Sequence, residues 1–150
     1  MKLPTWAMKN TEKYGRRIIH EHQMLEEQYP LFELQMQNQK MYAEGVLITG
    51  NRNIYKVRVC YPDDYPNSPP IAYILDKDVM RDSSVPHTYG VSDSGDGTEG
   101  LRICVLNPHD SVGQSWQPNF SVVTIIHLAV MWLHAYEVWK VKGIWSLPEH

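Results

Sequence analysis

The sequence predicts an α+β domain in which an N-terminal and a C-terminal helix accompany a four-stranded antiparallel sheet with one covered face. Three segments carry this prediction. Residues 11–28 place apolar side chains at helical spacing, residues 54–61 alternate apolar with polar side chains, and residues 122–141 are apolar on most sides. The chain of 150 residues is long enough to bury a substantial core. We therefore expect one domain over residues 1–150.

The first helix is expected to begin at Asn10 or Thr11, whose side chains suit the N-cap position. It should end at about Gln28, because Tyr29-Pro30 follows and a proline disfavours helical backbone in the residue before it. One face of this helix carries the apolar residues Tyr14, Ile18, Met24 and Leu25.

Four strands are expected at residues 32–37, 45–49, 54–61 and 71–75. Short connections between them, such as the glycine and asparagine turn at residues 50–53, favour an antiparallel meander with one solvated face. The third strand gives the clearest signal. Its expected core-facing residues are Tyr55, Val57, Val59 and Tyr61, and those on its other face are Lys56, Arg58 and Cys60.

Between the last expected strand and the final helix, residues 76–100 show little periodicity. Residues 92–100 consist of Ser, Gly, Asp, Thr and Glu alone, which is typical of a mobile loop or flap. Further on, Ser121 suits the N-cap of the long, largely buried final helix.

Composition excludes several classes of protein. A net charge of -3 argues against a general nucleic-acid binder, which usually carries a basic stripe. The 2 cysteines cannot form a disulfide framework, and residues 1–10 lack the apolar core of a signal peptide. The longest apolar run, residues 122–133, is interrupted and shorter than the roughly 20 residues of a bilayer span. We therefore expect a cytoplasmic protein without a membrane span.

Neither a metal nor a cofactor is expected. The sequence contains no Cys-x-x-Cys and no His-Glu-x-x-His motif. His127 and His134 lie two helical turns apart and are expected to be core histidines. The Gly-x-Gly-x-x-Gly at residues 95–100 follows a loop and precedes no helix, so it does not predict a dinucleotide site.

A proline-rich segment and an apolar-flanked cysteine are the most distinctive local features. The four prolines of residues 62–70 stiffen the backbone after the third strand, as expected of a segment that braces something. Downstream, Cys104 lies between Ile103 and Val105. A thiolate is a strong nucleophile, but a free cysteine is more often a small buried hydrophobe. By its local sequence, Cys104 fits either a nucleophile or a core residue.

The order of the motifs resembles the ubiquitin-conjugating enzymes. Tyr-Pro-x-x-Tyr-Pro-x-x-Pro-Pro at residues 61–70 precedes His87, then Ile-Cys at Cys104, then Trp-x-Pro at residues 116–118 and a long helix. The resemblance covers most of the chain, from about residue 11 to residue 140. It looks closest to bacterial members, because the chain ends soon after that helix, where larger relatives carry two more. It implies the ubiquitin-conjugating-enzyme fold.

The resemblance also implies a function. In that family the cysteine accepts the C-terminus of a ubiquitin-like protein from an activating enzyme, as a thioester, and passes it to an amine, usually an acceptor lysine. This role would fall on Cys104. Similar bacterial chains are encoded beside anti-phage nucleotide cyclases, where the C-terminal tail of the cyclase itself is conjugated. The implied partners are an activating enzyme, a ubiquitin-like protein or conjugated C-terminal tail, and an acceptor lysine.

One part of the family pattern is absent. The family commonly carries His-Pro-Asn shortly before the cysteine, and its asparagine supports the oxyanion or the active-site loop. Here His87 is followed by Thr88 and Tyr89, and no asparagine lies beside it. His87 is the expected counterpart of the histidine, and Tyr89, Asn107 or His109 could replace the asparagine.

Charged residues near the cysteine allow two interpretations each. His109 could be a base that takes a proton from the attacking amine, with Asp110 as its carboxylate neighbour. Alternatively, both residues could lie in a solvated turn. Asp93, Asp96 and Glu99 could attract an incoming amine, or could only keep the expected flap solvated.

Four cations crowd the start of the first helix, where the helix dipole is already positive. This placement indicates a partner with an acidic surface, and in the resembled family the same helix contacts the activating enzyme. A plain solvated face is the alternative. The four residues are Lys9, Lys13, Arg16 and Arg17.

Two other functions stay open at this stage. A non-catalytic binding module of the same fold would explain the missing asparagine, although such variants usually lack the cysteine. A cysteine hydrolase would pair Cys104 with His87 or His109, but the apolar flanks of Cys104 do not favour the ion-paired thiolate that such enzymes use. The leading prediction is a conjugating enzyme that acts through Cys104.

Overall fold

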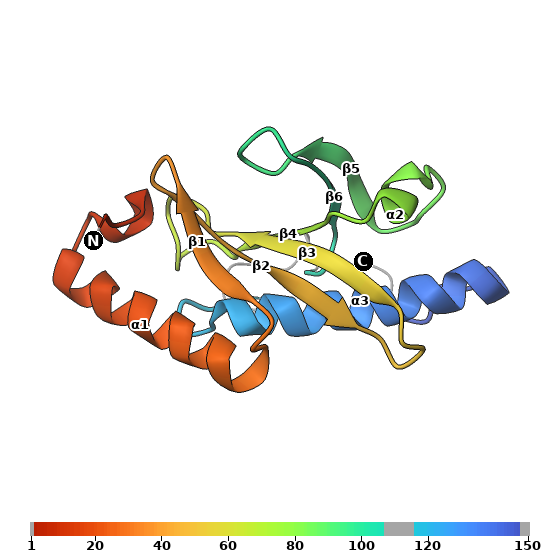
Figure 1. Ribbon diagram of the computed structural model, residues 1–150, viewed down its shortest axis with the longest axis horizontal. Helices are drawn as coiled ribbons and strands as arrows, with labels where there is room; N and C mark the ends of the chain where they lie inside the picture. Colours follow the sequence, from red (N-terminus) through yellow and green to blue (C-terminus); the bar gives the residue numbers. More distant parts are fainter. Residues whose placement is uncertain (1, 107–115, 148–150) are drawn as a thin grey trace.

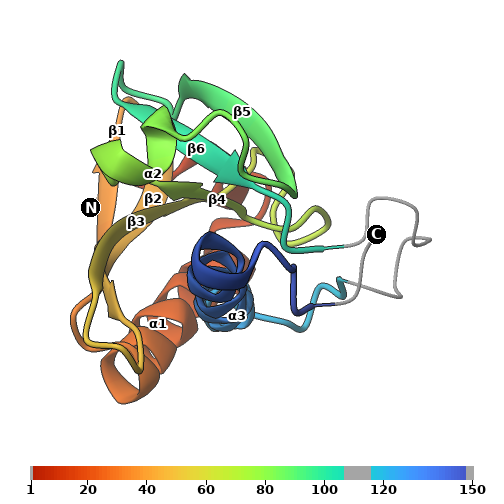
Figure 2. The same ribbon diagram turned by 90° about the vertical axis from the view of Figure 1, so that its right-hand side faces the viewer.

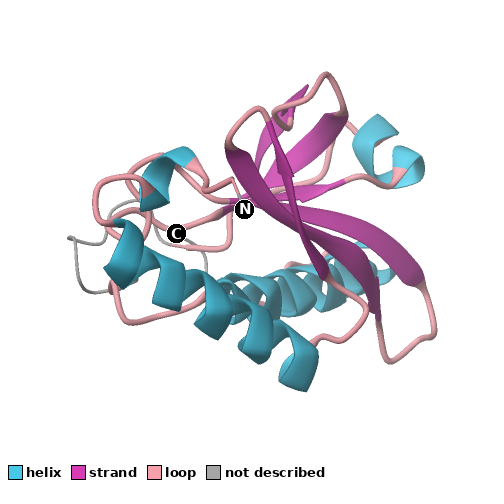
Figure 3. Ribbon diagram, turned by 60° about the vertical axis from the view of Figure 1, so that its left-hand side comes forward, coloured by secondary structure: helices cyan, strands magenta, loops and turns pink. Residues whose placement is uncertain are grey.

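The computed structural model describes residues 2–106 and 116–147 and has an α+β architecture (Figure 1). A six-stranded antiparallel sheet has the strand order β1-β2-β3-β4-β6-β5. The two long helices, α1 and α3, lie together on one face of this sheet (Figure 3). The elements in chain order are η1 (Thr5–Ala7), α1 (Thr11–Gln28), β1 (Glu33–Gln37), β2 (Lys40–Ile48), β3 (Ile54–Cys60), β4 (Ile71–Ile74), α2 (Lys77–Arg81), β5 (Thr88–Asp93), β6 (Glu99–Ile103) and α3 (Val122–Lys142).

The sheet corrects the expectation of four strands, because β5 and β6 form a hairpin where a mobile flap was expected at residues 92–100. The side chain of Asp93 closes the turn by accepting the backbone N–H groups of Gly95 and Gly97 at 2.7 and 3.0 Å. Both glycines have positive φ. On β6, a Cβ at Gly100 would lie 2.8 Å from the Cβ of Tyr73. The glycines and polar residues that suggested a loop therefore serve a tight turn and a close strand contact.

The third strand was predicted correctly on its core-facing side, since Tyr55, Val57, Val59 and Tyr61 are all buried. The expectation of a solvated second face is wrong at Arg58. This residue is 5% exposed, and its guanidinium binds Glu44 at 2.8 Å and Asp96 at 2.7 Å. The hairpin turn thus packs over this part of the second face. A buried arginine is tolerated there because two carboxylates compensate its charge.

Helix α3 forms the centre of the core, with nine buried residues that pack against the sheet and α1. It is long and apolar enough to cross a membrane by length and composition, so the expectation that this segment is too short for a span does not hold. Half of its most apolar window is buried within the fold, as in the core helix of a globular domain. His127 and His134 are exposed on α3 and are not core histidines.

A buried carboxylate connects the elements around this core. Glu21 of α1 is fully buried. Its Oε1 atom accepts hydrogen bonds from the hydroxyls of Tyr61 and Tyr65, at 3.0 and 2.8 Å, and from the backbone N–H of Val122, at 2.9 Å. Since the Ser121 side chain makes no capping bond, Glu21 supplies from another helix the negative charge that favours a helix N-terminus.

Arg17, one turn before Glu21, completes this network. Its Nε atom lies 3.4 Å from Glu21 Oε2. Its terminal nitrogens donate to the carbonyl of Pro118 at 2.8 Å, to the hydroxyl of Tyr65 at 2.9 Å and to the carbonyl of Phe120. Arg17 therefore links the buried Glu21 carboxylate to the chain that leads into α3.

The proline-rich segment is ordered against the same network. The indole N–H of Trp116 donates to the carbonyl of Pro66 at 2.8 Å, and its ring lies 6.1 Å from that of Tyr65. Trp6 packs edge-on against Tyr65 at 4.9 Å and stacks on Tyr61 at 5.8 Å. The segment expected to brace its surroundings thus carries an aromatic cluster between α1 and the start of α3.

Replacing Glu21 with glutamine should lower the free energy of unfolding by about 2–4 kcal/mol, because Arg17 loses its charged partner inside the fold. Urea denaturation measures this change. Glu12→Gln is the matched control on the same helix, since Glu12 is exposed and pairs only with Arg16; it should change the value by less than about 0.5 kcal/mol. Equal effects of the two substitutions would show that the buried network does not stabilise the fold.

Candidate active site

Cys104 follows β6 directly and is half-buried. Its backbone N–H donates to the carbonyl of His87 at 2.9 Å. The same carbonyl accepts the indole N–H of Trp132, on α3, at 3.1 Å. One carbonyl group therefore fixes the cysteine relative to both the start of β5 and the central helix. His87 itself adopts a positive φ of 58°.

A β-bulge places a tyrosine at the cysteine. Thr88 pairs with Ile103 and Gly90 with Arg102, so Tyr89 is the extra residue of β5. Bulges re-aim side chains and are common beside active sites. The Tyr89 hydroxyl lies 3.4 Å from Cys104 Sγ, and either atom can donate the hydrogen bond.

The ring of Tyr89 is held by a cation. The guanidinium carbon of Arg102 lies 4.6 Å from the ring centroid. The hydrogen bond to Cys104 raises the pKa of Tyr89, partial burial raises it further, and Arg102 lowers it. The pKa remains above its ordinary value of 10.0, so at neutral pH Tyr89 is a neutral hydroxyl that can donate a hydrogen bond beside the sulfur.

Cys104 also lines an apolar cavity of about 130 Å³. The His87 ring lies 4.9 Å from that of Trp145, which lies 5.5 Å from that of Trp132. Cys104 therefore lines a hollow beside the central helix and is not sealed in packed hydrocarbon. The lining residues are His87, Cys104, Val105, Leu128, Met131, Trp132, Trp145 and Leu147.

The structure brings together some of the residues singled out in the sequence. His87 and Tyr89 both contact Cys104, the first through its carbonyl and the second through its hydroxyl. Asn107, His109 and Asp110 lie outside the described residues.

Three residues of the site were missed by sequence reasoning. Trp132 was hidden within a uniformly apolar helix, and Arg102 and Trp145 stood in no recognisable motif. Trp132 contacts Trp145, which lies beyond the end of the same helix. Arg102 contacts Tyr89 across the β5–β6 pair. No sequence pattern indicated either contact.

The acidic residues before the cysteine divide by role. Asp93 closes the β5–β6 turn, and Asp96 pairs with Arg58 at 2.7 Å. This pairing and the bond to Thr98 lower the pKa of Asp96 to about 2. These two carboxylates therefore shape the hairpin, whereas Glu99 is exposed on β6.

The cations of the first helix divide similarly. Arg17 belongs to the network around Glu21, and Arg16 pairs with Glu12 at 3.1 Å on the surface. Lys9 and Lys13 are exposed. Any acidic partner would therefore meet the exposed cations, and Arg17 serves the fold.

The second cysteine has a different environment. Cys60 Sγ lies 3.2 Å from the carbonyl oxygen of Ser94, under the hairpin turn. Burial raises the pKa of Cys60 to about 12, although Arg58 acts in the opposite direction. Its thiolate fraction at neutral pH is therefore very small.

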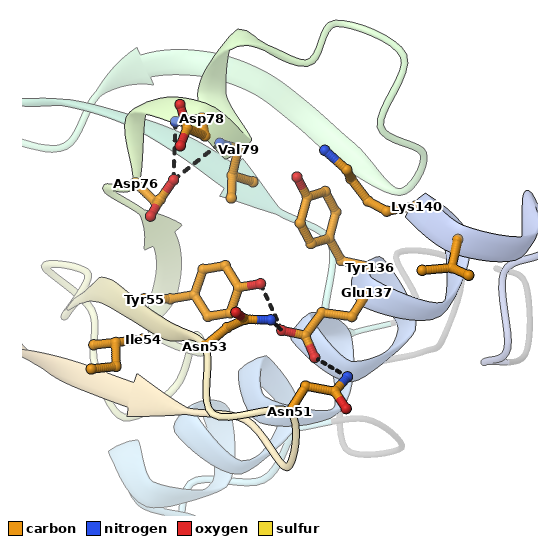
Figure 4. Close-up of a pocket in the computed structure, with 11 residues that line it drawn as sticks. Asn51, Asn53, Ile54, Tyr55, Asp76, Asp78, Val79, Tyr136, Glu137 and Lys140 are labelled. Carbon is orange, nitrogen blue, oxygen red and sulfur yellow. Dashed lines mark hydrogen bonds between the residues drawn. The ribbon is translucent and has the colours of Figure 1, made fainter.

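A second, larger hollow of about 380 Å³ lies farther along α3 (Figure 4). One of its charged lining residues, Glu137, accepts hydrogen bonds from Asn51, Asn53, Tyr55 and Thr49 at 2.7 to 3.0 Å. Burial alone would raise the pKa of Glu137, but these four bonds outweigh it and the pKa is lowered. Since both carboxylate oxygens are already bonded, Glu137 fastens the β2–β3 turn to α3. Among residues 2–106 and 116–147, no cluster of three or more His, Cys, Asp or Glu could hold a metal ion.

Comparison with known families gives one match. The model of the family described as Type II CBASS E2 protein (E2-CBASS) matches residues 21–150, which include β1 to α3 and Cys104. Comparison with curated proteins gives no significant match.

Alkylation distinguishes the two thiols. At pH 8, iodoacetamide should label Cys104 and leave Cys60 unmodified, because a thiol with a pKa of about 12 is ionised to only about one part in 10⁴ at that pH. Intact-mass spectrometry and peptide mapping measure the labelling. Cys60→Ser should keep the single modification and Cys104→Ser should lose it. A Cys104 that never reacts in the folded protein would contradict the open site.

Proposed function

The chain belongs to the Type II CBASS E2 family, and we propose that it is an E2-like conjugating enzyme of bacterial anti-phage defence. In this proposal Cys104 carries the C-terminus of another protein as a thioester and passes it to an amine. The observation that carries the proposal is the position of Cys104 Sγ, between the Tyr89 hydroxyl at 3.4 Å and an apolar cavity.

Loading of Cys104 is a thioester exchange. The Cys104 thiolate attacks the acyl carbonyl that an activating enzyme presents as its own thioester. A new S–C bond forms, the C–S bond to the activating enzyme breaks, and that enzyme's thiolate leaves. The acyl carbon has the same oxidation state in both thioesters, so the step needs no oxidant, reductant or cofactor.

Discharge of Cys104 is an aminolysis. A neutral lysine amine attacks the thioester carbonyl and gives a tetrahedral oxyanion. We assign the stabilisation of this oxyanion to the Tyr89 hydroxyl, which is protonated, lies at the sulfur and is held by Arg102. Collapse of the intermediate forms the amide and expels the Cys104 thiolate, while the amine proton passes to a base. His109 with Asp110 follows Cys104 closely in the sequence and is the candidate for this base, and Asn107 is a candidate for a second donor to the oxyanion.

The cavity contributes by excluding water. Its walls of Leu128, Trp132 and Trp145 cover one side of Cys104 with hydrocarbon and aromatic carbon. A thioester in such surroundings meets fewer water molecules, so that aminolysis is favoured over hydrolysis. The apolar wall can also contact the aliphatic stem of an acceptor lysine.

A binding module of the same family is the second candidate function. The sequence His87-Thr88-Tyr89, with no asparagine beside the histidine, favours it. The open position of Cys104 and the hydroxyl aimed at its sulfur favour catalysis instead. A cysteine hydrolase would need a histidine that forms an ion pair with the thiolate, whereas the group described at 3.4 Å from Sγ is the Tyr89 hydroxyl.

The exposed cations at the start of α1 suit the activating enzyme as partner. We assign this contact to Lys9, Lys13 and Arg16, because long, exposed cationic side chains raise the rate of encounter with an acidic surface.

The proposal predicts an adduct that a thiol reductant cleaves. The protein, incubated with an activating enzyme, its conjugated protein and ATP, should gain the mass of that protein at Cys104 and lose it on addition of dithiothreitol. Cys60→Ser should behave like the wild type. Cys104→Ser should form either no adduct or an oxyester that resists dithiothreitol. A reductant-resistant adduct on the wild type, or an adduct that persists in Cys104→Ala, would contradict the thioester.

A further inference from the structure

We propose that the free edge of β5 binds the C-terminal tail of the carried protein as an added antiparallel strand, whose last residue reaches Cys104. This inference rests on the proposed function, because it specifies how the acyl donor is held while its carbonyl meets the sulfur. Addition of an extended peptide to a sheet edge is an established mode of recognition.

The first argument is the edge itself. The strand order ends at β5, so one side of this strand has no neighbouring strand within the described part of the chain (Figure 2). The backbone N–H of Ser94 donates to the carbonyl of Thr98, so Ser94 directs its N–H group towards the β6 side. Hydrogen-bonded pairs alternate along an antiparallel ladder. Val91 and Asp93 therefore direct their backbone N–H and C=O groups to the free side.

The second argument is direction. β5 begins beside the cysteine, since Thr88 pairs with Ile103 and the Cys104 N–H bonds the carbonyl of His87. It then runs away from Cys104 towards Asp93. A strand antiparallel to β5 ends at the Thr88 end, and only this orientation delivers a C-terminal carbonyl to Cys104. A parallel strand would bring an N-terminus there instead.

The third argument is the exposed apolar surface of β5. Tyr89 is 53% and Val91 is 44% exposed. Edge strands are commonly protected by charges, prolines or short length. β5 carries one exposed charge, Asp93 at its far end, and near the cysteine it presents an aromatic and a β-branched side chain to solvent. Such side chains make favourable contacts with those of a paired strand. The bulge at Tyr89 lies at the cysteine end and leaves Gly90 to Asp93 in regular register.

The fourth argument is charge. Asp93 lies directly opposite Glu99 on the neighbouring strand, and both are exposed. Like charges at paired positions repel each other. A basic residue of an added strand would relieve this repulsion. With one tail residue opposite each residue of β5, the basic residue falls about five residues before the C-terminus.

The occupant is therefore an extended C-terminal tail with a cation about five residues from its end. Apolar or β-branched residues lie between this cation and the last residue, opposite Tyr89 and Val91.

Synthetic peptide thioesters test the proposal without an activating enzyme. The probes are octapeptides that end in glycine, carry a mercaptoethanesulfonate thioester and hold a lysine five residues before the end. Cys104 attacks the thioester carbonyl, forms acyl-Cys104 and releases mercaptoethanesulfonate. Acetyl-glycine mercaptoethanesulfonate has the same reacting group and no tail. Intact-mass spectrometry gives the acylation rate of each.

The octapeptide should acylate Cys104 at least about 10-fold faster than acetyl-glycine does. Exchange of its lysine for glutamate should remove most of this gain. N-methylation of single peptide bonds should slow acylation at every second tail residue and leave the residues between unaffected, because only alternate N–H groups face β5. These comparisons change the probe alone and leave the fold of the protein untouched.

A protein variant gives an independent check. Val91→Pro removes an N–H group that faces solvent, so the β5–β6 ladder stays intact. Its octapeptide rate should fall to the acetyl-glycine rate, and its acetyl-glycine rate should equal that of the wild type.

The outcomes separate the two proposals. Equal rates for the octapeptide and acetyl-glycine, or sensitivity to N-methylation without two-residue periodicity, would overturn the edge site and leave Cys104 as an acyl acceptor. Failure of every probe to acylate Cys104 would overturn the proposed function and the edge site with it.

Discussion

The buried carboxylate of Glu21 is the constraint on which the rest of the structure depends. An uncompensated buried charge costs several kcal/mol, so its partners must occupy fixed positions. These partners are two tyrosines at the end of β3 and in the proline-rich segment, Arg17 of the same helix, and the first N–H of α3. Helix α3 in turn holds the carbonyl of His87 through Trp132, and that carbonyl holds Cys104. The position of the Cys104 sulfur therefore follows from a network that begins in the first helix.

Local periodicity made α1, β3 and α3 predictable, because each extends over several turns or alternations of apolar residues. β5 and β6 were missed because they are short, one of them is largely exposed, and their connecting turn is rich in glycine. Arg17 was grouped with surface cations, since its own helix gives no sign of the carbonyls of Pro118 and Phe120 that it binds. Cys104 was singled out by the order of the motifs, and the structure places it beside Tyr89. The contact between Tyr89 and Cys104 depends on a bulge, which requires knowledge of strand register and cannot be obtained from composition or spacing.

The candidate site combines three physical conditions for acyl transfer: a half-buried thiol, a neutral hydroxyl at 3.4 Å and an apolar wall along α3. In our proposal this hydroxyl substitutes for the asparagine amide of the resembled family. A tyrosine serves this purpose as a donor on a rigid ring, which Arg102 holds by its face. The same bulged strand ends the sheet, so Tyr89 and the proposed tail-binding edge belong to one hairpin.

The central claim is that the Tyr89 hydroxyl stabilises the oxyanion at Cys104. Single-turnover discharge of purified acyl-Cys104 by free lysine tests it most directly. Tyr89→Phe should slow discharge by about 10² while the amount of loaded protein stays the same. Tyr42→Phe is the matched control, because Tyr42 also lies under an arginine, Arg58, but on β2; it should discharge at the wild-type rate. An unchanged rate in Tyr89→Phe would contradict the account.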